Sequence, residues 1–596
     1  MLLFRRFRQL PAANPAPSEV GLLPDCSTTN HDTDAGGSPA GSGRWARHPA
    51  AARSVAGVTT GLALGLVFVS LLLPSVPDRL TPGAFTRIPV EAIVGAAVLL
   101  VLPAKARRVV AVLAGAGLGL VTILKSLDMG FYSVLGRQFD LVLDWTLFDD
   151  AESFLKDSIG QAETIGVMSG VVLLLLALLV VMTLAVVRLT HLMAWHSAIA
   201  THATLVLGTV WITCATLGTQ VAGAPLTSWN TVGLVEENAR QVRASLKDEE
   251  AFAEVASHDS FGSMPPSQLL TGLRGKDVIF CFIESFGRSA VEFPDMAPIV
   301  DAALADGTKR LHAAGYSSRS SYLTSATYGG GSWLGHSTFL SGLWVSNQQR
   351  YRSVTSSDRM SLTGAFKRAG AWRTVGIMPG VSRSWPEAKF YGLDHLYDSR
   401  NLGYKGPQFS WSRMPDQYSL MAFEHLEHSK HGDKPLMSEI ILTSSHTPWA
   451  PLPKMLSWNE VGDGSVYNAI KKEGKSPQDV WKDPSQVRHE YARSIAYSVN
   501  SLVSYMESYG KKNTVLLFLG DHQPVSTVSG QHASRDVPVA IVAHDQAVMD
   551  RMSGWGWQDG LKPGPQAPVW KMDTFRDQFL TAYGPQGGPS SFPRPR

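Results

Sequence analysis

The sequence predicts an α-helical membrane domain followed by an extracytoplasmic α/β domain, whose mostly parallel sheet carries helices on both faces. Apolar segments long enough to span a bilayer occur only before about residue 220 of the 596-residue chain. Beyond about residue 272, short β-branched runs alternate with helical patterns, which is typical of a parallel sheet covered by helices. Acidic and histidine residues follow several of these runs and give the second domain a candidate active site.

The composition excludes one class of partner and indicates what stabilises the second domain. The formal net charge is +3 and no basic run occurs, so a nucleic-acid partner is not predicted. Of the three cysteines, Cys26, Cys214 and Cys281, only the last falls in the second domain, which therefore has no internal disulfide. Its roughly 300 residues are enough to bury a core instead.

Five apolar segments near the roughly 20 residues of a spanning helix follow a tail rich in Pro, Ala, Gly and Ser. The fourth contains "VVLLLLALLVVMTLAVV", which has no polar face and so favours a lipid-embedded helix over a core helix. The first begins too late for a cleaved signal peptide, which favours a retained anchor. The segments are approximately Val55–Leu73, Ile88–Ala104, Val109–Leu124, Ile165–Val187 and Ala198–Leu217.

Basic residues predict the orientation of these segments. Six arginines precede the first segment, "KARR" (Lys105–Arg108) joins the second to the third, and Arg188 follows the fourth. The loop before the fourth segment is acidic, "DLVLDWTLFDDAESF". Because positive charge is retained on the cytoplasmic side, we expect a cytoplasmic N-terminus, a multi-pass protein of the cell membrane and a second domain outside the cell membrane.

These patterns divide the chain into five parts. We expect a disordered cytoplasmic tail over 1–54, a transmembrane domain over 55–220, a helical connector over 221–271, a catalytic domain over 272–585 and a C-terminal tail over 586–596. The connector contains "VEENARQVRASLKDEEAFAEVA", whose charges are mixed. This favours a solvated spacer near the membrane over a lipid-binding helix.

Five short apolar runs have the length and β-branched content of buried parallel strands. Helical patterns such as "EYARSIAYSVNSLVSYMESYG" separate them. The predicted strands are Asp277–Ile283, Arg373–Met378, Ser438–Thr443, Thr514–Leu519 and Pro538–His544.

Chemically active side chains follow three of these strands. Glu284 follows the first, His446 comes shortly after the third, and Asp521 and His522 follow the fourth. The carboxyl ends of parallel strands meet at one edge of a sheet, where ligands bind, so we expect these groups to converge. Carboxylate and imidazole groups with a hydroxyl suit a divalent cation such as Mn²⁺, Mg²⁺ or Zn²⁺. Each residue alone could also be structural, as a hydrogen-bonded histidine or as Glu284 paired with Arg288.

The stretch "YGGGSWLGHSTFLSG", Tyr328 to Gly342, places three glycines directly before a predicted helix. Consecutive glycines carry an entropic cost, which is justified where the backbone must come close to a ligand at a helix N-terminus. Ser332 stands at that start, and it could act as a nucleophile or only cap its helix.

With these residues, the sequence resembles the alkaline phosphatase/sulfatase superfamily, and most closely its lipoteichoic acid synthase-like membrane phosphoglycerol transferases. The resemblance covers the membrane anchor and roughly residues 272–585. The family places a nucleophile at a helix start, ten residues before the glycine of a Ser/Thr-Gly pair, as Ser332 stands before Gly342. The synthase branch usually has threonine there.

The resemblance implies roles for further residues. Glu284, Ser332, Asp521 and His522 match the family's metal site, which implies one divalent ion, Mn²⁺ first, with Mg²⁺ or Zn²⁺ as alternatives. His446 matches the histidine that holds the substrate phosphate. The family's Trp and Arg that grip the glycerophosphate should fall near "PGVSRSWPEAKFYG", where Arg383 and Trp385 are candidates in a different order and spacing. His336, one turn after Ser332, is a candidate for contact with the substrate or with the metal ligands.

The mechanism implied by the resemblance is a two-step transfer. Ser332, activated by the metal, attacks the phosphodiester of a phosphatidylglycerol-like lipid, and a phospho-serine intermediate forms. A glycolipid or polymer hydroxyl outside the cell then accepts the group; water in its place would make the protein a hydrolase.

Other functions remain open at this stage. A phosphoethanolamine transferase would share the anchor, but that branch typically carries several disulfides. A sulfatase needs a Cys/Ser-x-Pro-x-Arg motif, whereas Trp-Leu-Gly-His follows Ser332. A catalytically inactive, polymer-sensing relative would normally have lost a metal ligand, and all four are present.

Overall fold

The computed structural model describes residues 49–585, except 136, 143, 146, 149–150, 153–154, 157–159, 222–223, 229, 383, 410, 412, 431, 433 and 531. The predicted N-terminal tail up to residue 48, Cys26, Arg383 and the C-terminal tail therefore lie outside the described residues. Cys214 and Cys281 are both free thiols.

All five predicted apolar segments form helices, and four of these are long and apolar enough to cross a membrane. The helix α2 has only 12 residues, about 18 Å at the α-helical rise, against a hydrocarbon core about 30 Å thick. Pro89 and Pro103 flank α2, and proline removes a backbone donor. The predicted turn Lys105–Arg108 instead belongs to the beginning of α3. The helices are α1 (Pro49–Leu72), α2 (Val90–Val101), α3 (Ala104–Leu135), α5 (Gln161–Trp195) and α6 (Ser197–Leu217).

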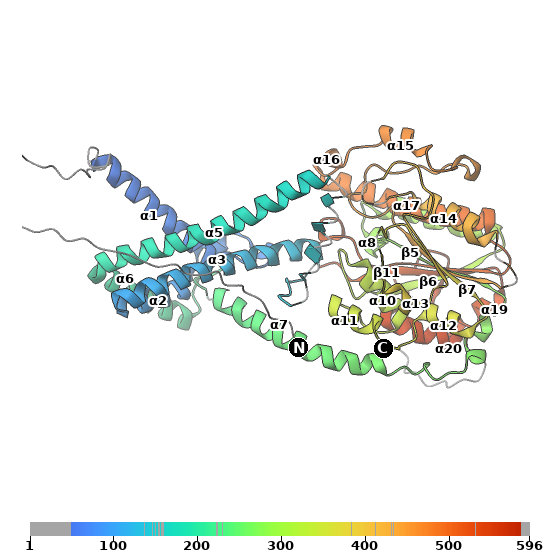
Figure 1. Ribbon diagram of the computed structural model, residues 1–596, viewed down its shortest axis with the longest axis horizontal. Coiled ribbons are helices and arrows are strands. Elements are labelled where there is room, and N and C mark those ends of the chain that lie inside the picture. Colours follow the sequence, from blue (N-terminus) through green and yellow to red (C-terminus); the bar gives the residue numbers. More distant parts are fainter. Residues whose placement is uncertain are drawn as a thin grey trace, which may run out of the picture. The chain divides into compact units, whose positions relative to one another are not determined.

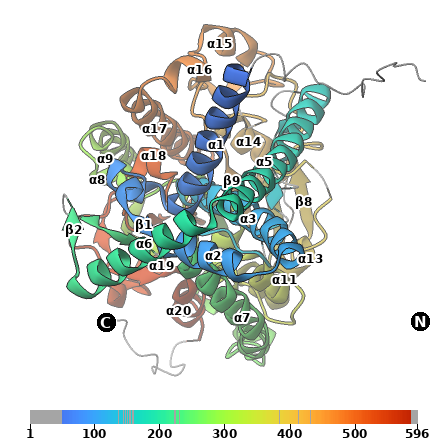
Figure 2. The ribbon, with the colours of Figure 1, turned by 90° about the vertical axis from the view of Figure 1, so that its left-hand side faces the viewer.

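The helices of this region pack in pairs. Figure 2 shows α3 beside α5 and α2 beside α6. Gly115 of α3 comes so close to α5 that an added Cβ would lie 2.6 Å from the Cα of Thr183. Small residues at such positions allow helix backbones to approach within a membrane. Short strands flank these helices in the chain: β1 (Ile88–Pro89), directly before α2, lies parallel to β4 (Thr227–Ser228), and β2 (Gln220–Val221), after α6, pairs with β3 (Ala224–Pro225).

The predicted connector is the helix α7 (Asn230–Ser257). Its last turns do not form a solvated spacer, because Phe252 and Ala256 are buried against residues of α10 and α11. Arg350 also donates from Nε and Nη2 to the two carboxylate oxygens of Asp248, at 2.7 and 2.6 Å. One charged residue of α7, Asp248, therefore forms a bidentate ion pair with Arg350 of the α/β domain.

The α/β domain is built on a nine-stranded mixed sheet in the order β12-β6-β11-β10-β5-β9-β7-β8, with β13 also paired to β6. The strands from β10 to β8 are parallel, and β11 is antiparallel to both of its neighbours. Their bounds are β5 (Asp277–Ile283), β6 (Ser317–Thr324), β7 (Arg373–Met378), β8 (His395–Asp398), β9 (Leu436–Leu442), β10 (Thr514–Gly520), β11 (Asp536–Ala543), β12 (Gln558–Asp559) and β13 (Val569–Lys571).

Helices cover both faces of this sheet, as predicted (Figure 1). Alternate residues of β5 point to opposite sides: Cys281 packs in one core and Phe280 in the other. This is why its sequence is apolar throughout. One face carries α9 (Ala297–Ala313), α14 (Asp416–Phe423) and α17 (Pro484–Tyr509); the other carries α10 (Ser332–Ser341), α12 (Leu362–Ala369) and α20 (Phe575–Ala582).

Seven shorter helices complete the domain. They are α8 (Ser289–Glu292), α11 (Gln348–Thr355), α13 (Ala388–Tyr391), α15 (Tyr467–Glu473), α16 (Pro477–Val480), α18 (Ser526–Ser529) and α19 (Gln546–Asp550).

Candidate active site

Glu284 directly follows β5, at the carboxyl edge of the parallel part of the sheet. Its backbone N–H donates to the carbonyl of Leu442 at the end of β9, and its carbonyl accepts from Ser445 Oγ at 2.5 Å. The next residue, Ser285, has a φ of 55°, an uncommon conformation for a residue with a side chain. This sharp turn lets Ser285 Oγ donate back to Glu284 Oε1 at 2.9 Å.

Asp521 and His522 follow β10, the strand beside β5. Asp521 Oδ1 accepts hydrogen bonds from the backbone N–H groups of Ser285 and His522, each at 2.8 Å. His522 Nδ1 lies 2.8 Å from the carbonyl oxygen of Gln523. A carbonyl can only accept, so Nδ1 carries the proton and Nε2 is available on the other side of the ring.

Ser332 is the first residue of α10, after the predicted glycine run. Gly329 and Gly331 have φ values of 72° and 74°, which glycine adopts without a steric cost. Thr327 Oγ1 donates to the carbonyl of Gly330 at 2.5 Å and closes the loop. The helix therefore begins at a left-handed backbone conformation of Gly331, without a side-chain cap.

These elements bring the four predicted metal-site residues together. Ser332 Oγ donates to Glu284 Oε2 at 2.8 Å and lies 3.1 Å from His522 Nε2. His522 Nε2 is 3.4 Å from Glu284 Oε1 and 3.9 Å from Asp521 Oδ2. Glu284, Asp521 and His522 are all buried and each offers a ligand atom within 4.8 Å of the others.

The donor set fits a divalent cation. Asp521 Oδ2 is buried without a hydrogen-bond partner among the described residues, an arrangement that costs free energy unless the oxygen is satisfied by some further group. Two carboxylates, one imidazole and one hydroxyl are ligands that Mn²⁺, Mg²⁺ and Zn²⁺ accept. The residues present thus explain how such an ion could be held.

His336 lies beside Asp521. Its Nε2 is 3.5 Å from Asp521 Oδ2, and its ring packs against Phe282 with centroids 4.2 Å apart. The residue His336 is 7% exposed. These contacts favour an effect on the metal ligands over direct contact with substrate.

His446 stands at the rim of the site, where its side chain is partly exposed. Its Nδ1 lies 2.8 Å from the Thr447 carbonyl, so Nδ1 carries a proton and Nε2 is available. The ring stacks on Trp411, with centroids 4.0 Å apart and planes 18° apart. Trp411 was not predicted, because no motif in the sequence marks it.

The two candidates for gripping the headgroup are not brought to the cluster by any described contact. Trp385 Nε1 donates to the Tyr351 hydroxyl at 3.0 Å, and its ring lies 5.2 Å from that of Tyr391. Trp385 thus contacts residues of α11 and α13. Arg383 lies outside the described residues.

The electrostatics of the cluster favour ionised groups. Burial alone would raise the pKa of Glu284, but the hydrogen bond and charge of His522, followed by the charge of His446, lower it below its usual value. Burial would lower the pKa of His522, yet the charge of Asp521 and the contact with Glu284 raise its pKa to about 9. The two carboxylates thus favour a positive charge at His522 Nε2, which either a proton or a divalent cation supplies.

No family model and no curated protein matches the sequence. Among solved structures, the chain is similar to the lipoteichoic acid synthase LtaP from Listeria monocytogenes, with 15% identity over 53% of this chain and 74% of that one, at a TM-score of 0.36. It is similar to the phosphoglycerol transferase GacH of Streptococcus pyogenes, with 11% identity over 56% and 90%, at a TM-score of 0.32. A Vibrio parahaemolyticus protein shares 16% identity over 57% and 75%, at a TM-score of 0.33. That protein is described as a member of the alkaline phosphatase superfamily.

Proposed function

We propose that the chain is a membrane-anchored, metal-dependent phosphotransferase that moves a phosphoglycerol-type headgroup from a phospholipid to an acceptor outside the cell. One observation carries the proposal: the Ser332 hydroxyl lies 2.8 Å from Glu284 Oε2 and 3.1 Å from His522 Nε2. A hydroxyl that meets a carboxylate and an imidazole at the edge of a parallel sheet is placed to act as a nucleophile. Residues 272–585 form the catalytic domain in this proposal.

Each residue of the cluster has a defined part. Glu284, Asp521, His522 and Ser332 would hold the ion. When bound there, a divalent cation supplies positive charge that lets the Ser332 hydroxyl lose its proton and that draws charge from a phosphoryl oxygen. The hydrogen bonds from Ser285 N–H and His522 N–H to Asp521 Oδ1 fix the orientation of that carboxylate. The Nδ1–H of His522 is held by Gln523, which aims Nε2 at the cluster.

The transfer then runs in two balanced steps. Ser332 Oγ attacks phosphorus as its proton passes to His446 Nε2, the bond to the diacylglycerol oxygen breaks, and that oxygen takes the proton from His446. An acceptor hydroxyl then attacks the phospho-serine, its proton passes through His446 Nε2 to Ser332 Oγ, and Ser332 Oγ leaves. The N–H groups at the start of α10 would bind phosphoryl oxygens during both steps.

The membrane anchor gives this chemistry its substrate. Four apolar helices hold the chain at the bilayer, so a phospholipid headgroup is within reach of a domain tethered beside it. With α2 as a fifth, shorter crossing the number of crossings is odd, and the basic residues of the tail and of Lys105–Arg108 then support a cytoplasmic N-terminus with the catalytic domain outside. A glycolipid or polymer acceptor there is the second substrate.

The decisive experiment compares the full-length wild-type chain with Ser332→Ala in vesicles of phosphatidylglycerol, and measures released diacylglycerol. We expect Ser332→Ala to abolish release and Ser332→Thr to keep it. Ser337→Ala, five residues along the same helix, is the matched control and should keep release. Unchanged turnover by Ser332→Ala would exclude the nucleophile, and release only from phosphatidylethanolamine vesicles would exclude the phosphoglycerol headgroup.

A further inference from the structure

The glycine run before Ser332 lies against the last turn of the membrane helix α3. Gly329 has a φ of 72°, and a Cβ added to it would overlap the carbonyl oxygen of Val134. The nearest atoms that this carbon would meet all belong to α3. A Cβ added to Gly330 would lie 3.4 Å from Cδ2 of Leu135, in ordinary van der Waals contact. The close approach that glycine allows at position 329 is therefore to the membrane domain.

A hydrogen bond holds the same turn of α3. Ser526, the first residue of α18, donates from Oγ to the carbonyl oxygen of Ser133 at 3.1 Å. The last carbonyl groups of a helix have no partner within it, so each needs a donor from elsewhere. In the chain, α18 follows shortly after His522. The segments that carry Ser332 and His522, two of the predicted metal-site residues, thus both contact the end of α3.

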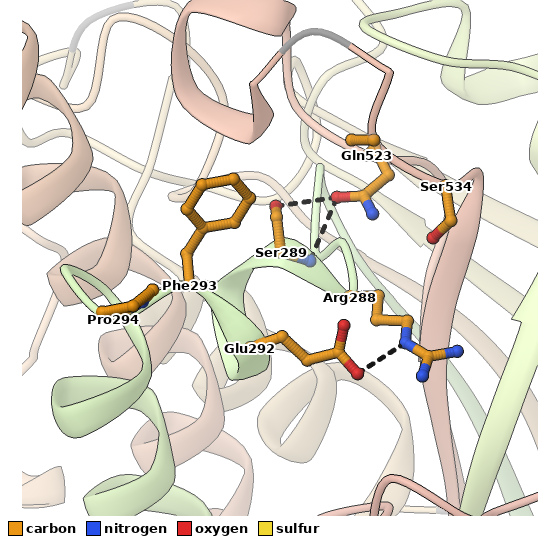
Figure 3. Close-up of a pocket in the computed structure, with 8 residues that line it drawn as sticks. Arg288, Ser289, Glu292, Phe293, Pro294, Gln523 and Ser534 are labelled. Carbon is orange, nitrogen blue, oxygen red and sulfur yellow. Dashed lines mark hydrogen bonds and ion pairs between the residues drawn. The ribbon is translucent and has the colours of Figure 1, made fainter.

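The glycine run is also bound to Gln523. The N–H of Gly329 donates to the Gln523 carbonyl oxygen at 2.9 Å, and that oxygen also accepts from His522 Nδ1 at 2.8 Å. Gln523 is 1% exposed, and its side-chain Oε1 accepts from Ser289 Oγ at 2.8 Å, which fixes its position (Figure 3). A shift of Gly329 would therefore displace Ser332, three residues along the chain, and strain the contacts that orient His522.

The helix α7 also contacts the start of α10. Leu334, two residues after Ser332, packs in one cluster with Phe252 and Ala256 of α7. α7 ends at Ser257, before the catalytic domain begins at about residue 272. The start of the nucleophile helix is therefore contacted by two helices, α3 and α7, that both lie outside the catalytic domain.

We propose that Leu135 is a positioning residue: the last turn of α3 supports the glycine run, and this contact holds Ser332 where it can attack. The inference rests on the proposed function, because it needs Ser332 to be the nucleophile. A displacement of about 1 Å can lower a rate about 100-fold, so a side chain that touches no substrate can still control the reaction. The catalytic domain is then fully active only while it contacts α3, a helix long and apolar enough to cross the membrane that holds the lipid.

The test measures the covalent phospho-serine adduct on the full-length chain, by intact mass at a series of quench times after mixing with phosphatidylglycerol vesicles. The final extent of the adduct counts the folded, active molecules, whereas its rate reports how Ser332 is positioned. We expect Leu135→Ala to lower the rate about tenfold and to keep the extent. Leu135→Met, which restores an apolar contact of similar volume, should recover most of the rate.

Two matched controls separate the contact from other effects. Val134→Ala should react at the wild-type rate, because Val134 is 50% exposed and meets Gly329 through its backbone carbonyl, which the substitution keeps. Gly329→Ala should slow the adduct, and its control is Gly370→Ala. Gly370 has a φ of 71°, and a Cβ added to it meets no atom of the described residues within 4 Å. Both alanines therefore strain the backbone to a similar degree, but only the first disturbs α3.

The outcomes distinguish this inference from the proposed function. Ser332→Ala should form no adduct, and an adduct on that variant would reject the proposed function and this inference with it. Where Ser332→Ala behaves as expected, a wild-type rate in Leu135→Ala would overturn the positioning role alone. A reduced extent at an unchanged rate would also overturn it, because it reports a loss of folded protein, and so would equal slowing in Val134→Ala.

Discussion

The hydroxyl of Ser332 donates to Oε2 of Glu284 across 2.8 Å, although the two residues are 48 positions apart in the chain. Glu284 directly follows the central strand β5, and Ser332 begins the helix α10 on one face of the sheet. The strand and the helix position these two groups separately, so the contact forms only in the folded chain. It is also the contact that a bound cation would use, because a carboxylate and a hydroxyl oxygen are both ligand atoms.

We expect the purified chain to hold about one divalent ion, and chelation to abolish release of diacylglycerol. Asp521→Asn should weaken binding of the ion because it removes the charge of a buried ligand. Metal content by mass spectrometry of the purified protein checks this, with Asp295→Asn, which alters an exposed carboxylate, as the control. Full metal content in Asp521→Asn would contradict the assigned ligand set.

His336 should raise the affinity for the metal through its contact with Asp521. Its Nε2 lies 3.5 Å from Asp521 Oδ2, and loss of such a supporting group typically costs about 10–100-fold in metal affinity. We expect this loss in His336→Leu, with recovery of most of the affinity in His336→Gln, whose amide nitrogen replaces Nε2. Titration calorimetry with Mn²⁺ measures it directly. Equal affinities for the leucine and glutamine variants would leave His336 with a packing role only.

Trp411 should position His446. The stacked rings, 4.0 Å apart, and the Thr447 carbonyl, 2.8 Å from Nδ1, together restrict the orientation of the imidazole. Trp411→Ala removes this restriction, and we expect kcat to fall about tenfold, which is part of the roughly 10²–10⁴-fold that a positioned acid–base group contributes. Trp411→Phe should keep most of the rate because it preserves a ring face.

The pH dependence of kcat/KM separates positioning from packing in this case. A displaced acid–base group should change the shape of the profile, whereas a loss of folded protein would scale the whole profile evenly. An evenly scaled profile for Trp411→Ala would contradict the positioning role.

The buried carboxyl group of Glu439 should make the stability of the fold depend on pH. This residue of β9 is 1% exposed, and burial raises its pKa to about 8 from an ordinary value of 4.5. The folded chain therefore keeps a proton that the unfolded chain releases above pH 4.5. The stability that this proton contributes is fully present below that pH and is lost progressively up to about pH 8. The loss in the free energy of unfolding reaches about 3 kcal/mol by pH 7.

Glu439→Gln should remove this dependence, because the amide does not titrate. Its melting temperature should exceed that of the wild type at about pH 8 and approach it at about pH 5. Thermal unfolding followed by circular dichroism at both pH values measures the difference. A wild-type advantage at the higher pH would show that Glu439 is ionised in the folded state.

Much of the fold could be predicted because buried parallel strands are apolar on both faces. The bounds of β5 and β7 agree with the prediction, and β10 differs by one residue. β11 was predicted as part of a parallel sheet and is antiparallel, since an apolar run carries no information on direction. β6, "SSRSSYLT", was missed because serines interrupt its apolar pattern.

The candidate residues at the strand ends could be predicted from their order along the chain, but the side chains that contact them could not. Ser332 could be placed from its glycines, whereas Trp411 and Gln523 act through contacts between distant segments. The short α2 was expected to be a full span because hydropathy does not show where flanking prolines end a helix.

The most direct test of the central claim is the intact mass of the full-length chain after brief exposure to phosphatidylglycerol without an acceptor. The proposed mechanism predicts a covalent increase equal to one phosphoglyceryl group, mapped to Ser332 and missing from Ser332→Ala. An adduct on another residue, or catalytic release of diacylglycerol by Ser332→Ala, would contradict it.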